Sequence, residues 1–182
     1  DPALGRSQVF DRVIEKAVHG AGIMISLLTD RYLLSEYCTQ EIQWFCDKVK
    51  AESCGLIVDD YLRIFPVLLY NLPPESWPEV CRGALAFPFH DASGTDVGEP
   101  LKPDSKAFDK QLRGLVDELH TLLTRLKQHE AAPTPDESDA SPASTFTIFM
   151  ASSPDDLRPI RRQLSKTLAQ QGITVIGDIP PP

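Results

Sequence analysis

Four side chains that could take part in chemistry lie close together in the segment L-T-D-R-Y-L-L-S-E-Y-C-T-Q-E-I, residues 28–42. On a helix, residues three or four apart share a face, so Cys38 and Tyr37 are both placed beside Glu41. Ser35 suits the N-cap position, where a side-chain hydroxyl accepts a hydrogen bond from a free backbone N–H. Glu41 is different from its neighbours because no structural duty at its position demands a carboxylate.

Two predicted elements position Glu41. The apolar run 22–28 (G-I-M-I-S-L-L) is bounded by glycine and by polar residues, which predicts a short buried strand. The helix that begins after Ser35 has one continuous apolar face, made by Cys38, Ile42, Phe45 and Val49. Strands of an open α/β sheet end at a ligand crevice at their carboxyl ends, so Glu41, in the second turn of the next helix, can face it.

The remaining elements alternate in the same way. Pro66 lacks a ladder donor, which predicts an edge, a strand end or a bulge within its strand. The leucine spacing of the last long helix is typical either of a coiled-coil seam or of a helix packed along a sheet, and it covers too few heptads to favour the seam. The order predicts a parallel, doubly wound α/β fold. The predicted elements are helix 7–20, strand 64–70, strand 84–89, helix 105–129, a linker at 130–144 with three prolines and four acidic residues, strand 146–151, a helix capped by Ser153 to Asp156, and strand 172–176.

The spacing around Glu41 resembles the central signature of the Toll/interleukin-1 receptor (TIR) domain family. That signature follows an apolar strand, and its aromatic position holds tyrosine here where tryptophan is commoner. The resemblance covers about residues 7–129 and implies a flavodoxin-like doubly wound parallel sheet. The segments 64–67 and 84–91 resemble later strands of the family. The residues that match the signature are Thr29, Tyr32, Ser35, Tyr37, Cys38, Glu41 and Ile42.

The resemblance implies two alternative functions. Enzymatic TIR domains cleave the nicotinamide–ribose bond of NAD⁺, and their essential glutamate matches Glu41. Tyr37, Cys38 and Ser35 would then contact the substrate, with NAD⁺ as substrate and with no cofactor and no metal. A carboxylate suits this reaction because it can stabilise the oxocarbenium character that the ribose gains. The alternative is an adaptor that self-associates or binds other TIR domains, in which Glu41 is a solvated helix residue.

The resemblance also raises a question of domain organisation. Residues 1–129 form a TIR-like domain with only three predicted strands, so we expect its opening strands to lie before Asp1. Residues 130–144 are the linker. Residues 145–182 predict a β-α-β unit, which we interpret as the start of a second TIR-like module in preference to permuted strands that complete the first sheet. The second arrangement stays open because three strands plus two give the flavodoxin-like count.

Composition limits the partners. The formal net charge is −8 and the pI is about 4.9, which argues against nucleic acid or an anionic membrane as the main partner. No apolar run reaches the length of a membrane span. The four cysteines include no C-x-x-C pair, so we expect reduced thiols, no zinc site and a cytoplasmic location. The basic cluster of Arg158, Arg161 and Arg162 is interpreted as a solvated face, with phosphate binding as the alternative.

Overall fold

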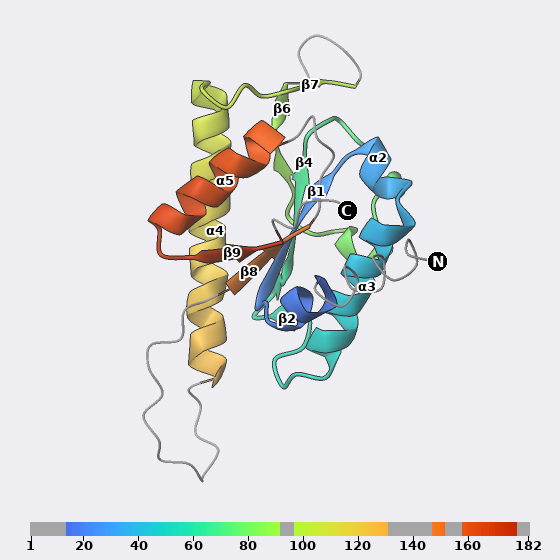
Figure 1. Cartoon of the computed structure of the whole chain (residues 1–182), viewed down its shortest axis with the longest axis vertical. Coiled ribbons are helices and arrows are strands. Elements are labelled where there is room, and N and C mark those ends of the chain that lie inside the picture. Colours follow the sequence, from blue (N-terminus) through green and yellow to red (C-terminus); the bar gives the residue numbers. More distant parts are fainter. Residues whose placement is uncertain (1–13, 92–96, 131–146, 152–157, 178–182) are drawn as a thin grey trace, which may run out of the picture.

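A computed structural model describes residues 14–91, 97–130, 147–151 and 158–177 of the chain. Its centre is a five-stranded, all-parallel sheet in the order β5-β4-β1-β8-β9. The strands are β1 (Ile23–Leu28), β4 (Ile64–Leu68), β5 (Phe87–Pro88), β8 (Thr147–Met150) and β9 (Thr174–Ile176). Helices cover both faces of this sheet (Figure 1), so the predicted α/β class with a parallel sheet is confirmed.

The helices divide into two layers. Residues 14–19 are helical, and together with α3 (Glu36–Lys50) they cover one face of the sheet. The helices α4 (Lys106–Glu130) and α5 (Arg158–Gln170) cover the other face, as Figure 1 shows. The chain moves in opposite directions across the sheet after β1 and after β8, so crossovers of the same hand place α3 and α5 on opposite faces. The switch of direction therefore lies between β1 and β8.

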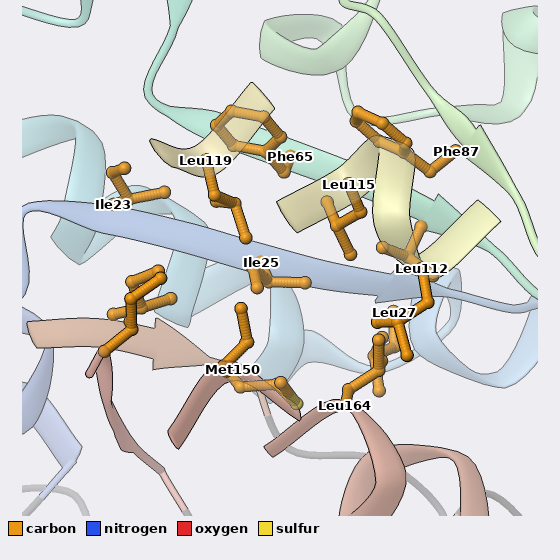
Figure 2. Packing of buried hydrophobic residues seen from close by; sticks show 14 of the residues in the cluster. Ile23, Ile25, Leu27, Phe65, Phe87, Leu112, Leu115, Leu119, Met150 and Leu164 are labelled. Carbon is orange, nitrogen blue, oxygen red and sulfur yellow. The ribbon is translucent and has the colours of Figure 1, made fainter. Parts of the chain in front are cut away.

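Strand β1 explains this layering because its side chains alternate between the two layers. Ile23, Ile25 and Leu27 pack towards α4 and α5, while Met24 and Leu28 pack towards α3. Figure 2 shows the first group together with side chains of α4, α5 and β8. The leucines of α4 are buried along the sheet, so the helix packs on the sheet as preferred and forms no seam with another helix among the described residues.

The strands at the carboxyl end of the chain differ from our preferred interpretation. β8 pairs with β1, in the register Ile23↔Ile148 to Ile25↔Met150, and β9 pairs with β8. Strands β8 and β9 therefore extend the first sheet and, among the described residues, do not open a sheet of their own. With β8 and β9 counted first, the strand order is 2-1-3-4-5, which is compatible with a flavodoxin-like fold.

Pro66 lies within β4, which is an interior strand of the sheet. Its partner on the β1 side is Ser26, but β5 pairs only with Val67 and Leu68. The ladder on the β5 side thus begins after Pro66, so the proline removes no hydrogen bond from that ladder. β4 is therefore not an edge strand, so the expectation of an edge is wrong. At Pro66 itself, however, β4 has no partner residue on the β5 side.

Several short elements complete the described chain. They are α2 (Asp30–Leu33), the hairpins β2 (Ile57–Val58) with β3 (Tyr61–Leu62) and β6 (His90–Asp91) with β7 (Glu99–Pro100), and the 3₁₀ helices η1 (Pro74–Ser76) and η2 (Glu79–Cys81). The expected cap at 153–156 lies outside the described residues. In the part of the chain that is described, no helix combines the length and the apolar character needed to cross a membrane.

Arg63, directly before β4, ties together the amino-terminal edge of the sheet. It is 2% exposed, and its guanidinium donates to Gly22 O (2.8 Å), Gly55 O (3.0 Å) and Glu52 Oε2 (2.6 Å). Partial burial alone would raise the pKa of Glu52, but hydrogen bonds from Lys48 and Arg63, with their charges, hold that pKa below its usual value. The pair therefore stabilises the fold while Glu52 is ionised.

We predict that Glu52→Gln removes part of the acid sensitivity of the fold. The pKa of Glu52 is lower in the folded state, so its contribution is present above the ordinary value of 4.5 and is lost as the pH falls through the folded value. The difference in free energy of unfolding between wild type and Glu52→Gln should shrink as the pH falls from about 6 to about 3. Urea titrations measure this, with the exposed Glu36→Gln as control. A constant difference across that range would contradict it.

Candidate functional site

Two helix caps in succession shape the segment after β1. Thr29 caps α2, and its side-chain oxygen accepts a hydrogen bond from the Tyr32 backbone N–H at 3.1 Å. Ser35 then caps α3, accepting from the Cys38 N–H at 3.3 Å, as the sequence predicts. The short helix α2 was not expected, and it carries Tyr32 back over the sheet. The cap role leaves Ser35 half-buried at the amino end of α3.

Tyr32 connects the sheet to α3. Its side chain is 2% exposed, and its hydroxyl donates to Ser26 Oγ of β1 at 3.4 Å and lies 3.5 Å from the Cys38 carbonyl oxygen. Burial raises the pKa of Tyr32 well above its usual value, and the charge of Glu41 adds to the increase. The phenol is therefore neutral at physiological pH and acts as a hydrogen-bond donor.

Glu41 is fully buried, at 0% exposure, on the face of α3 that packs against the sheet. Its interpretation as a solvated helix residue is therefore wrong. The carboxylate is close enough to Tyr32 and Cys38 to raise the pKa of both. An ionised carboxylate that leaves water costs free energy, and an apolar residue would fill this position more cheaply. Packing alone therefore does not account for a carboxylate at this position.

The other two predicted site residues have different surroundings. Cys38 is buried beside Glu41, and burial raises the pKa of its thiol to about 11, so it is a poor nucleophile and serves as a wall. Tyr37 is half-buried, and its ring meets Trp44 edge-on with the ring centres 6.3 Å apart. The structure thus brings Cys38 and Glu41 together with Tyr32 and Ser26. Tyr32 matches the signature but was not among the predicted site residues, and Ser26 was not predicted at all. The signal for Ser26 was a single polar residue within an apolar strand.

Across the switch point, the ends of β8 and β9 are held by Arg161 of α5. This side chain is 6% exposed, and its guanidinium donates to the carbonyl oxygens of Met150 (2.9 Å), Ala151 and Gly177. The interpretation of a solvated face is wrong for Arg161, whereas Arg158 and Arg162 are exposed. Spacing alone did not separate the three arginines, because only a helix register against the sheet decides which one points inward.

Gly177 follows β9 and lies directly against the end of β8. Its φ is +106°, and a side chain there would overlap the Met150 carbonyl oxygen and press on the Phe149 ring. Glycine is therefore required for the chain to leave β9 next to β8. The segments 152–157 and 178–182, which follow β8 and β9, lie outside the described residues. The candidate site therefore has buried Glu41, Tyr32 and Cys38 on the β1 side and buried Arg161 on the β8 side.

A cavity of about 510 Å³ lies at the other end of the sheet. Its walls include Ile64 and Phe65, the first residues of β4, and it opens between the β2–β3 hairpin and the segment before β5. Because β1 and β4 are parallel, this cavity is at the amino ends of the strands, away from Glu41. Two of its lining residues, Ile57 and Leu85, are 61% and 62% exposed.

Other kinds of site are not supported by the described residues. Among them, no group of three or more histidine, cysteine or acidic side chains could hold a metal ion. The four cysteines are free thiols, and Cys38, Cys46 and Cys81 are buried. Burial raises the pKa of Cys81 to about 12, which keeps that thiol protonated.

Comparisons with known proteins give no match: the chain fits no family model, and neither a curated protein nor a solved structure resembles it significantly. The case for a function therefore depends on the geometry described above.

We predict that Arg161→Met destabilises the fold by about 2–4 kcal/mol, because it leaves buried carbonyl groups without their donors. The matched change at the exposed neighbour, Arg162→Met, should alter the free energy of unfolding by less than about 0.5 kcal/mol. Urea denaturation followed by circular dichroism measures both values. Equal effects of the two substitutions would show that the Arg161 guanidinium does not hold β8 and β9 together.

Proposed function

We propose that this chain is a TIR-type module of the flavodoxin-like class that hydrolyses the nicotinamide–ribose bond of NAD⁺ in the cytoplasm, with Glu41 as its catalytic carboxylate. One observation carries the proposal. A fully buried glutamate lies beside a neutral tyrosine hydroxyl, at the switch point of a parallel sheet. The crevice at such a point is where α/β sheets of this kind bind ligands, and the signature resemblance names the same residue.

The chemistry asks little of the protein beyond charge and position. Nicotinamide leaves as a neutral molecule with the electron pair of the C–N bond, and positive charge develops on the ribose. Glu41 would stabilise that charge and hold a ribose hydroxyl, since a carboxylate in a site that excludes water acts more strongly than one in solution. Water then adds to the ribose, giving ADP-ribose and a proton.

The surrounding residues would prepare Glu41 for this task. Tyr32 is fixed by Ser26 and by the first turn of α3, so its hydroxyl can orient a group bound next to Glu41. Cys38 supplies an uncharged wall beside the carboxylate because its thiol stays protonated. Glu41 has no exposed surface, so the side chains that cover it must move before its carboxylate can contact NAD⁺.

We predict that the chain releases nicotinamide from NAD⁺ and that Glu41→Gln lowers kcat by about 100-fold or more, the size of effect seen when one stabilising group is removed from a site of this kind. Glutamine keeps the shape but not the charge. Glu36→Gln on the exposed side of the same helix is the matched control and should keep kcat within about twofold. Chromatography of the reaction mixture measures nicotinamide. Equal rates of nicotinamide release in both variants would show that Glu41 is not the catalytic carboxylate. No release by the wild-type chain would exclude NAD⁺ hydrolysis as its function.

The second candidate, an adaptor that binds its own kind or other TIR domains, is favoured by a different observation. Ile57 and Leu85 are large apolar side chains, both are more than half exposed, and both line the cavity next to the edge strand β5. Exposed apolar side chains gathered at one place mark protein contacts more often than isolated ones do. This surface is distinct from the Glu41 crevice.

We predict that Leu85→Ser weakens any self-association through this surface at least about tenfold in dissociation constant, the loss expected for one well-buried apolar contact. Leu34 is 85% exposed but lies between α2 and α3, away from the cavity, so Leu34→Ser is the matched control. Sedimentation velocity over a range of concentrations measures both. An equal effect of the two changes would argue against a contact at the cavity.

A further inference from the structure

The elements β8, α5 and β9 form a unit with its own internal ties. β8 pairs with β9 from Thr147↔Thr174 to Phe149↔Ile176. Arg161 of α5 holds the carbonyl groups of Met150 and Gly177, one at the end of each strand. These bonds join parts of the unit to one another and involve no residue before 147. These bonds hold the three elements of the unit to one another.

The backbone of this unit pairs with the rest of the described chain at one strand, β1, and its apolar side chains pack in the same cores. β8 pairs with Ile23, Met24 and Ile25 of β1. Figure 2 shows Met150 of β8 and Leu164 of α5 gathered with Ile25 and Leu27 of β1. Without the unit, β1 would be an apolar edge strand with unpaired backbone groups, which is an unfavourable surface that any matching strand would cover.

The chain connects α4 to the unit only through residues 131–146. Sixteen residues span at most about 58 Å when extended. The sequence of this connection is acidic, contains three prolines and has no large apolar residue up to Ser144. The unit 147–177 follows α4 in the chain but pairs with β1, the first strand in the described sequence. The β1 edge of a second copy offers the unit the same pairing surface as the β1 edge of its own chain.

We propose that two copies of this chain exchange the unit 147–177, so that β8 of one copy completes the sheet on β1 of the other. The closed monomer and the exchanged dimer contain the same β1–β8 contacts, so the connection and the protein concentration set their balance. In the dimer, each crevice has Glu41, Tyr32 and Cys38 from one copy and Arg161 from its partner. The site is then shared between chains. This proposal rests on topology and holds whatever the crevice binds.

Cysteines placed at one register pair test the exchange in folded protein. Ile23 and Ile148 are partners on β1 and β8 and are fully buried on the same face. We would unfold the single variants Ile23→Cys and Ile148→Cys together, refold them at high concentration, oxidise them and look for a covalent dimer on a non-reducing gel. In a background in which Cys38, Cys46, Cys54 and Cys81 are replaced by alanine, each chain carries only one thiol, so a disulfide between positions 23 and 148 requires exchange. The expected result is a heterodimer whose fraction rises with protein concentration.

Two controls make the result decisive. Phe149→Cys replaces Ile148→Cys as the out-of-register partner, because Phe149 faces the opposite layer, and should give at least about fivefold less dimer. The double variant Ile23→Cys/Ile148→Cys should close within one chain at low concentration. No heterodimer in the mixture, or equal dimer with Phe149→Cys, overturns the proposal.

Discussion

Strand β1 is paired on both sides and buried on both faces, and the position of every larger element depends on it. Its ladder with β4 fixes where α3 returns to the sheet, and its ladder with β8 fixes where α5 lies. Alternating side chains of one strand hold two helical layers apart, so a shift of one residue would exchange the layers. Towards its carboxyl end β1 pairs with β4, and Tyr32 contacts this part of the strand through its hydrogen bond to Ser26.

The polar groups near that end have unequal effects on stability. Arg161 satisfies several carbonyl groups that would otherwise be buried without donors, so it stabilises the fold. Glu41 is buried on the sheet-facing side of its helix, where an apolar side chain would serve packing better. The contacts of Arg161 explain its burial, whereas the burial of Glu41 is what the proposed catalytic role would explain.

Local patterns in the sequence predicted much of the fold. The apolar run before Thr29, the cap at Ser35 and the periodic face of α3 all describe neighbours along the chain, and all are confirmed. The burial of Glu41 and Arg161 could not be predicted, because it depends on which side of each helix meets the sheet. The placement of β8 beside β1 depends on pairing between residues more than 120 positions apart, for which the sequence has no local signal. The strand predicted at 84–89 is longer than the observed β5, which covers only Phe87 and Pro88. The apolar Leu85 lies before β5 and is 62% exposed, so apolar character alone did not mark the start of the strand.

The place of β8 in the sheet has a consequence for synthesis on the ribosome. Chains emerge amino end first, and domains fold as units once their residues are available. Strand β8, which pairs with one edge of β1, is made after residues 14–130, so those residues leave the ribosome with that edge of β1 still open. During that interval the nascent chain exposes Ile23 and Ile25 to whatever binds apolar strands. A chaperone that recognises extended apolar segments could therefore bind β1 before β8 has been made and has paired with it.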